Sequence, residues 1–199
     1  SIDGVEVPVF PTPTIGMIGL LEDKDKVMSL NFKDKGDLIF LLGDYKNDIS
    51  SSEYLASYHG VKESPAPYFD LEKEFALHGM ISGLIQEELV NAVHDVADGG
   101  LFITLFEMAA PGELGFDVES DEEIRLDAFL FGEGQGRAVV TVNEDSEEDF
   151  IEYILDKSVN CTLLGHVTKG KLNVDGESYG FIQEAKEIYD NALENKLEA

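Results

Sequence analysis

Residues 93–101 read VHDVADGGL and form the most suggestive local pattern in the chain. The pattern predicts a strand over residues 92–96, a tight turn at Asp98-Gly99-Gly100 and a helix over residues 101–110 that ends at Pro111. Glycines at the start of a helix let backbone N–H groups approach an anion, and the helix N-terminus adds partial positive charge. The turn therefore has two interpretations, one as a phosphate-binding site and one as a purely conformational feature.

Two aspartates beside this turn bear on that choice. Asp95 and Asp98 would repel a phosphate group unless Mg²⁺ or a basic side chain lay between them. The segment is neither a Walker loop nor a full dinucleotide-binding fingerprint. Local chemistry alone therefore favours the conformational interpretation.

On both sides of this segment, strand and helix patterns are interspersed along the chain. Further strands are predicted over residues 37–43, 114–118, 136–142 and 162–168, and further helices over 53–58, 70–90, 149–156 and 182–199. Serines at 50–52 are expected to cap the helix over 53–58. This mixture predicts an α/β (α+β) fold in which helices are layered on a mixed sheet.

The N-terminal stretch predicts a domain boundary. Residues 5–10 alternate in polarity, prolines forbid a helix, and residues 15–21 form an apolar run that predicts a buried strand with little sequence before it to pair with. We interpret residues 1–26 as the last strand and linker of a preceding domain, 27–180 as an α/β domain, and 181–199 as an amphipathic helix. That helix could dock on its own domain or on a partner, and the first is favoured.

The charge balance limits the partners that the chain can bind. Its 199 residues include 41 acidic and 14 basic side chains, which gives a net charge of −27 and a pI near 4.2. Such a surface repels nucleic-acid phosphates and anionic lipid headgroups, so we expect no nucleic-acid and no membrane partner. The only cysteine is Cys161, so an internal disulfide is excluded and a reducing, cytoplasmic location is expected. No run is apolar and long enough to indicate export or a membrane span.

A second glycine-rich loop reads FGEGQGR over residues 131–137 and precedes an apolar strand. It could present polar side chains and bare amides to a ligand, with Arg137 as a candidate phosphate partner. Equally, it could be a flexible connection in which Arg137 pairs with carboxylates. The three histidines outside the 93–101 segment and Cys161 have no partners at metal-ligand or nucleophile spacing, so packing roles are favoured for them.

Five segments, in order, carry a family resemblance. They read PTPTIGMIG (11–19), SEYL (52–55), HDVADGGL (94–101), FGEGQGR (131–137) and LGHV (164–167). Together they resemble the phosphoribosylformylglycinamidine synthase family, whose superfamily includes aminoimidazole ribonucleotide synthetase, selenophosphate synthetase and a hydrogenase-maturation protein. The resemblance implies a final α/β domain, preceded by the last strand of an ATP-binding domain. Apolar surface around residues 9–21 is then expected to be exposed in the isolated domain.

The resemblance also implies an ATP-dependent ligase of purine biosynthesis. In that family, ATP phosphorylates the amide oxygen of formylglycinamide ribonucleotide, and ammonia from a glutaminase subunit or domain then displaces phosphate. ATP and Mg²⁺ would bind mainly in the missing N-terminal portion of the same chain, so this fragment alone is expected to be inactive. Two alternatives stay open, namely another ligase of the superfamily and a non-catalytic acidic interaction module.

Individual residues receive candidate roles from the resemblance and from local chemistry, and none of these roles is catalytic or metal-ligating. The candidates for substrate binding are Glu133, Gly134, Gln135 and Arg137. The family commonly has Ser at the position of Gly134, so one hydroxyl is missing here. The candidates for the nucleotide side of a second, structural site are His94, Asp95, Gly99 and Gly100.

Overall fold

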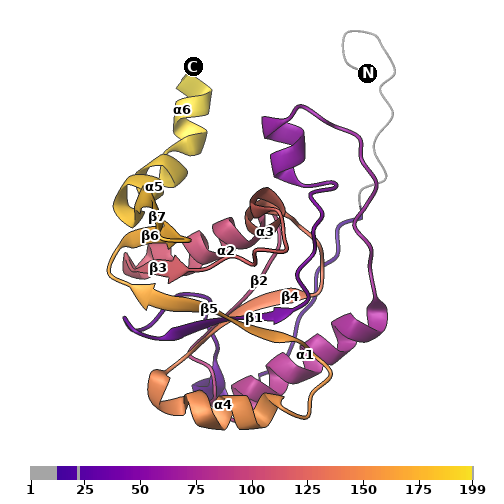
Figure 1. Cartoon of the computed structure of the whole chain (residues 1–199), viewed down its shortest axis with the longest axis vertical. Helices are drawn as coiled ribbons and strands as arrows, with labels where there is room; N and C mark the ends of the chain where they lie inside the picture. Colours follow the sequence, from indigo (N-terminus) through magenta and orange to yellow (C-terminus); the bar gives the residue numbers. More distant parts are fainter. Residues whose placement is uncertain (1–12, 22, 199) are drawn as a thin grey trace.

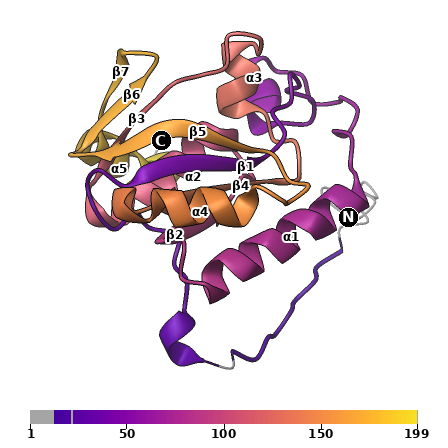
Figure 2. The same ribbon diagram turned by 60° about the horizontal axis from the view of Figure 1, so that its bottom comes forward.

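The computed structural model describes residues 13–21 and 23–198, which form one seven-stranded sheet with helices on both faces (Figures 1 and 2). The strands are β1 (Leu38–Gly43), β2 (Ala92–Asp95), β3 (Gly115–Val118), β4 (Arg137–Val142), β5 (Cys161–Thr168), β6 (Lys171–Val174) and β7 (Glu177–Phe181). Their order across the sheet is β2-β4-β1-β5-β3-β6-β7. All neighbours are antiparallel except β3 and β6, which are parallel, so the predicted mixed sheet is confirmed.

Strand β1 shows why the sheet needs helices on both sides. It lies between β4 and β5, and its side chains alternate between two separate apolar clusters. Ile39 and Leu41 belong to one cluster, whereas Phe40 and Leu42 belong to the other. A strand buried on both faces reads as a continuous apolar run, which is the pattern that the sequence has here.

The helices complete these two clusters. Helices α1 (Leu71–Gln86) and α4 (Glu147–Ile154) cover one face, and the Phe150 ring of α4 packs on the Phe40 ring with centroids 4.8 Å apart. Helices α2 (Gly100–Ala109), α3 (Leu126–Phe131) and α5 (Ile182–Asp190) cover the opposite face, and α6 (Ala192–Glu198) follows α5. Four short turns complete the fold: η1 (Lys24–Lys26), η2 (Tyr54–Tyr58), η3 (Ala110–Gly112) and η4 (Glu144–Ser146). None of the helices in the described part of the chain has the length and apolar character of a membrane span.

Caps explain where two of the predicted helices begin. The Asp70 carboxylate accepts hydrogen bonds from the backbone N–H groups of Glu72 and Lys73, both at 3.1 Å, at the start of α1. The Ser52 hydroxyl accepts one from the Leu55 N–H at 3.1 Å, which confirms the predicted serine cap of η2. Helix α1 ends earlier than predicted because Glu88 adopts a positive φ of 59° and reverses the chain.

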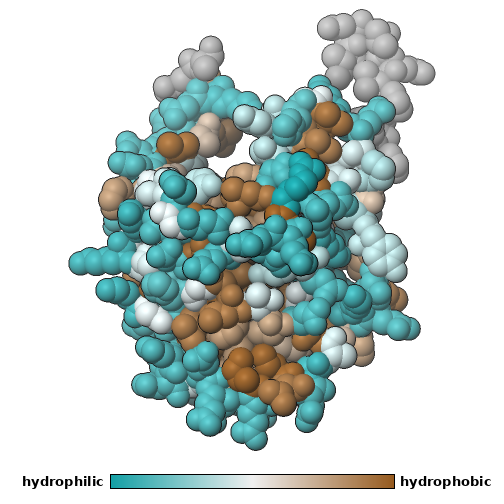
Figure 3. All heavy atoms as spheres, viewed as in Figure 1, coloured by the Kyte–Doolittle hydropathy of each residue, from teal (hydrophilic) through white to brown (hydrophobic). Residues whose placement is uncertain are grey.

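The large apolar residues of α1 are exposed in its first half and buried in its second. Leu71 and Phe75 are 71% and 79% exposed, while Leu77, Met80 and Leu84 are buried. The N-terminal half of α1 extends past the ends of the strands (Figure 2), where Lys73 contacts Asp44 but Leu71 and Phe75 stay open. Apolar side chains also gather on the surface over α4 (Figure 3), where Ile151 is partly exposed.

Residues 15–21 do not form the predicted strand. The described residues offer them no strand partner, and a strand without a partner leaves its backbone N–H and C=O groups unpaired. Ile15, Met17, Ile18 and Leu20 are between 82% and 103% exposed, which confirms the expected apolar surface over this part of the segment. The alternating stretch predicted at residues 5–10 lies outside the described residues.

The C-terminal region differs from its prediction in one respect. The helix predicted over residues 182–199 is two helices, because the chain breaks at Asn191 between α5 and α6. Ile182 is fully buried and Ala185 packs against the same cluster, so the helix docks on its own domain, as was favoured. The hairpin β6–β7 and helix α3 were not predicted.

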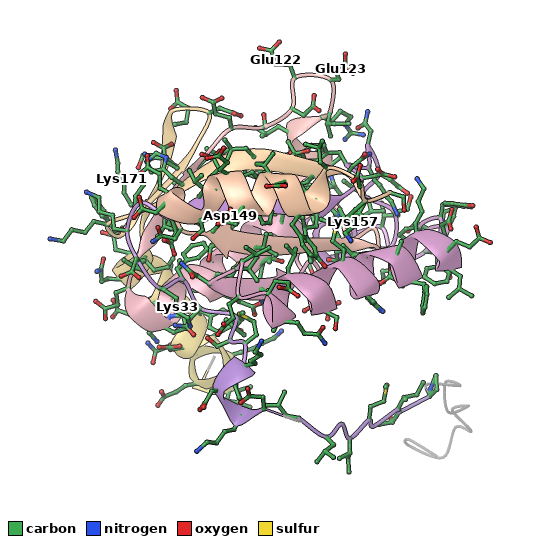
Figure 4. All side chains as sticks on the ribbon, turned by 90° about the horizontal axis from the view of Figure 1, so that it is seen from below. Lys33, Glu122, Glu123, Asp149, Lys157 and Lys171 are labelled. Atoms are coloured by element: carbon green, nitrogen blue, oxygen red, sulfur yellow. The ribbon has the colours of Figure 1, made fainter. Side chains whose placement is uncertain are left out.

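The acidic surface leads to a prediction about salt. Figure 4 shows the labelled charged side chains pointing outward from the body, Glu122 and Glu123 at a loop tip among them. With a net charge of −27, self-repulsion opposes the compact state. We expect Tm to rise by about 5 °C when NaCl is raised from about 0.01 M to about 1 M. For a chain of this length, that shift corresponds to a gain of ~2 kcal/mol in the free energy of unfolding.

Differential scanning calorimetry at pH 7 measures this change. Because screening depends on ionic strength, NaCl and KCl should act equally. A Tm that does not change or falls with salt would contradict the prediction.

Candidate functional site

The turn between β2 and α2 has the backbone geometry that its glycines suggested. Gly99 and Gly100 have φ values of 84° and 72°, in the left-handed region that favours glycine. A Cβ on Gly100 would lie 2.8 Å from the carbonyl oxygens of Leu130 and Gly132. The turn therefore packs directly against the loop that follows α3, and the two glycine-rich motifs of the sequence meet here.

A carboxylate of the protein occupies the turn. Glu133 Oε1 accepts hydrogen bonds from the backbone N–H groups of Gly99 and Glu53, both at 2.8 Å. The Gly99 N–H is the kind of donor that an anion at a helix N-terminus would use. Glu133 thus joins three segments that are distant in sequence, and it fills the position where a phosphate oxygen was considered.

Arg137 is an internal support of the glycine-rich loop. The residue is 4% exposed, and its guanidinium donates to the carbonyl oxygens of Gly134 (3.0 Å) and Gly132 (2.6 Å). Burial lowers the pKa of Arg137 to about 10, which leaves it charged at neutral pH. One of the two alternatives considered was that Arg137 pairs with carboxylates. That alternative is wrong, because the observed partners of Arg137 are backbone carbonyl oxygens.

A small cleft of about 260 Å³ lies where the two motifs meet. It is lined by Asp95, Asp98, Glu133, Gln135 and Arg137, with Glu74 from α1 and the backbone between these residues. Gly134 is buried beneath it against Lys46, and His94 and Gly100 lie outside its lining. The structure thus brings together one predicted residue from the first motif and three from the second.

The charges in this cleft do not fit the phosphates of ATP. Four of its side chains are carboxylates, and the Gly99 N–H is already bonded to Glu133. Among the described residues, no group of three or more His, Cys, Asp or Glu side chains is arranged to hold a metal ion that could offset these charges. The small cleft of this chain is thus lined mainly by carboxylates, with Arg137 as its one basic side chain.

A larger neighbouring cleft of about 520 Å³ contains basic groups that no motif of the sequence singles out. Lys46 donates to the carbonyl oxygen of Gln135 at 2.8 Å. The pKa of Lys46 is lowered, mainly by burial and to a smaller extent by the positive charge of the nearby Arg137. Lys73 pairs with Asp44 at 2.6 Å, and this hydrogen bond lowers the pKa of Asp44. Asp44 and Lys46 directly follow the buried strand β1, and this position is the sequence signal that could have identified them.

The remaining candidates have local partners. His94 lies between two carboxylates, with Nδ1 3.1 Å from Asp95 and Nε2 3.0 Å from Glu107. His78 pairs with Glu74 one helical turn away at 3.2 Å. Burial raises the pKa of the Cys161 thiol to about 12, so its thiolate is scarce at neutral pH, as expected for a packing role.

The chain is similar in sequence to a group of curated proteins. The chain is 35% identical over 195 residues to phosphoribosylformylglycinamidine synthase subunit PurL of Alkaliphilus metalliredigens, a match that covers 96% of this chain and 26% of the relative. The subunit PurL of Chlorobium luteolum is 38% identical over 205 residues, with 98% and 27% covered. The chain thus spans about a quarter of the length of these curated relatives.

Solved structures share the fold. The structure of T. maritima PurL complexed with FGAR superposes with a TM-score of 0.70 at 18% identity, covering 82% of this chain and 30% of that chain. Hydrogenase maturation protein HypE in complex with ATP superposes with a TM-score of 0.53 at 16% identity, covering 79% and 53%.

A family match identifies the domain itself. The family described as "AIR synthase related protein, C-terminal domain" matches residues 34–176. This range begins just before β1 and ends in the β6–β7 turn, so it contains both glycine-rich motifs and six of the seven strands. The chain belongs to the AIR synthase related protein C-terminal domain family.

Proposed function

We propose that this chain is the C-terminal α/β domain of a phosphoribosylformylglycinamidine synthase. The observation that carries the proposal is the alignment of 96% of the chain with a PurL subunit at 35% identity. The reaction would join formylglycinamide ribonucleotide, ATP and ammonia to give formylglycinamidine ribonucleotide, ADP and phosphate. The γ-phosphoryl group would pass to the amide oxygen, and ammonia would then displace it as phosphate.

In this proposal the domain supports a site that other parts of the protein complete. ATP and Mg²⁺ would be held mainly by the portion of the protein outside this chain, which is consistent with the poor fit of the small cleft for phosphate. A glutaminase subunit or domain would supply ammonia in the cytoplasm. Residues 1–26 would belong to the preceding ATP-binding domain, 27–180 to the α/β domain, and 181–199 to the C-terminal helical region.

The exposed segment 13–21 supports this arrangement. Met17, Ile18 and Leu20 are each more than 90% exposed, and a cluster of bare apolar side chains is typical of a surface that a partner covers. We propose that the preceding part of the protein covers it. Gln135, Glu133 and Asp95 would then face the substrate from the opposite side of the shared site, and Gly99 and Gly100 would shape it.

The test compares this chain with the same chain restored to its N-terminal portion. We expect ADP formation that depends on ammonia and formylglycinamide ribonucleotide in the restored protein only. A restored protein that is folded and binds ATP but shows no substrate-dependent turnover would overturn the proposal in favour of another ligase of the superfamily or an interaction module.

A pair of variants tests the covered segment. Ile18→Asp should leave the melting temperature of this chain unchanged, because the side chain is fully exposed here, but should lower activity of the restored protein. Thr14→Asp introduces the same charge at an exposed polar position of the same segment and should have little effect. Equal activity of the two restored variants would argue against burial of Ile18.

A further inference from the structure

A line of polar side-chain contacts runs from the C-terminal helix α5 to the edge of the candidate site. The Tyr189 hydroxyl donates to Glu107 Oε1 at 3.2 Å, and Glu107 Oε2 lies 3.0 Å from His94 Nε2. His94 Nδ1 in turn lies 3.1 Å from the Asp95 carboxylate, which lines the small cleft. The contacts thus connect α5, α2 and β2 in one line.

The chemistry of Glu107 fixes the direction of these bonds. A carboxylate can only accept hydrogen bonds, so Glu107 bonds to His94 only through a proton on Nε2, and Asp95 only through a proton on Nδ1. A neutral ring carries one N–H proton and can therefore donate to only one of these two carboxylates at a time. Glu107 accepts the Tyr189 proton on its other oxygen, and this hydrogen bond raises the pKa of Tyr189. A histidine ring is oriented, and its tautomer selected, by the group that its nitrogen contacts.

Packing holds the start of α5 and the His94 ring in place, whereas Tyr189 and Asp95, at the two ends of the line, are 54% and 78% exposed. Ile182, at the start of α5, is fully buried, and its backbone N–H donates to the Gly170 carbonyl oxygen at 2.8 Å. The Tyr189 ring lies 5.2 Å from the Phe106 ring, next to Glu107 on α2. In the middle of the line, the His94 side chain is only 16% exposed. The position of the Tyr189 hydroxyl therefore depends on the docking of α5.

We propose that α5, through Tyr189 and Glu107, holds the His94 ring in one orientation and one tautomer beside Asp95. Glu107 is then a positioning residue, and the docking of α5 is coupled to the geometry of the candidate site. A partner that displaced α5 would release Glu107 and change the surroundings of Asp95. This coupling belongs to the described chain and does not depend on the proposed ligase reaction.

The test is nitrogen NMR of the imidazole rings in the full chain above neutral pH. In the unmodified chain the Nε2–H tautomer of His94 should predominate. Tyr189→Phe keeps the ring that packs on Phe106 but removes the hydroxyl, so we expect the Nε2–H population to fall and the Asp95 amide signal to shift. Tyr179→Phe removes a hydroxyl from a ring that packs 5.5 Å from Phe102, and it should leave both signals in place.

A second variant tests the middle of the line. The amide of Glu107→Gln can donate to Nε2, so the Nδ1–H tautomer, which can donate to Asp95, should replace the Nε2–H form. Signals of His94 that are unchanged in Tyr189→Phe but altered in Glu107→Gln would refute the coupling to α5. Signals that are unchanged in both would refute the whole proposal. Unchanged amide signals of β1 establish that each variant is folded.

Discussion

Replacing Gly100 with alanine is expected to lower the free energy of unfolding by ~3 kcal/mol or more, the sum of a left-handed backbone at an L-residue and overpacking. Gly100 has a φ of 72°, and a Cβ there would lie 2.8 Å from backbone atoms of Leu130, Phe131 and Gly132. All three are backbone contacts, so no side chain can rotate away to make room. The turn and the glycine-rich loop would have to separate.

Urea unfolding followed by circular dichroism measures this change, and Gly79→Ala is the matched control. Gly79 lies on the exposed side of α1, and a methyl group there would meet no neighbouring atom within 4 Å, so its replacement should raise stability by ~0.5–1 kcal/mol. A loss at Gly100 of less than about 1 kcal/mol, below the usual range for overpacking, would contradict the close packing of the two motifs.

The two motifs could be placed on their elements from sequence because each is governed by local rules. Short apolar stretches predicted β2 and β4, and the Asp98-Gly99-Gly100 turn predicted where α2 begins. An apolar run predicted β1 as a strand, and the structure shows that it is covered on both faces. The α/β class follows from these few elements.

The contacts that build the site could not be predicted in the same way. Glu133 bonds to the N–H groups of Glu53 and Gly99, which are 80 and 34 positions away along the chain. Nothing local distinguishes Glu133 from the many exposed carboxylates of this acidic protein. Only the three-dimensional approach of three loops selects it, and the same holds for the carbonyl partners of Arg137.

Errors in the elements have two physical causes. Segment 15–21 has the composition of a strand, but a strand also needs a neighbour with which to share hydrogen bonds. The hairpin β6–β7 was missed although Asp175-Gly176, a favoured hairpin turn, lies between its strands. Its outward-facing polar residues reduce the apolar signal that marks a strand.

Glu133 is the residue whose removal should most affect the candidate site. Glu133→Ala leaves the N–H groups of Gly99 and Glu53 without the oxygen that now accepts both hydrogen bonds. Each lost bond to a charged acceptor contributes ~1.5 kcal/mol or more, so we expect the free energy of unfolding to fall by ~3 kcal/mol. Glu133→Gln keeps a carbonyl oxygen in the same place and should lose only ~1 kcal/mol.

The sign of the change in the free energy of unfolding distinguishes a carboxylate that supports the fold from one that is left unbonded for a ligand. In a protein with a net charge of −27, removal of an unbonded carboxylate relieves repulsion and should stabilise the fold slightly. Asp98→Ala, at an exposed position of the same turn, is the control that shows this smaller, opposite effect.

Hydrogen exchange followed by NMR gives the site-specific measurement. The Gly99 and Glu53 amides should exchange faster in Glu133→Ala than in Asp98→Ala, because only the first variant removes their acceptor. Unchanged exchange at both amides would mean that Glu133 is not bonded to them in solution. In that case Glu133 would be free to contact substrate directly, and the Gly99 N–H would again be open to an anion.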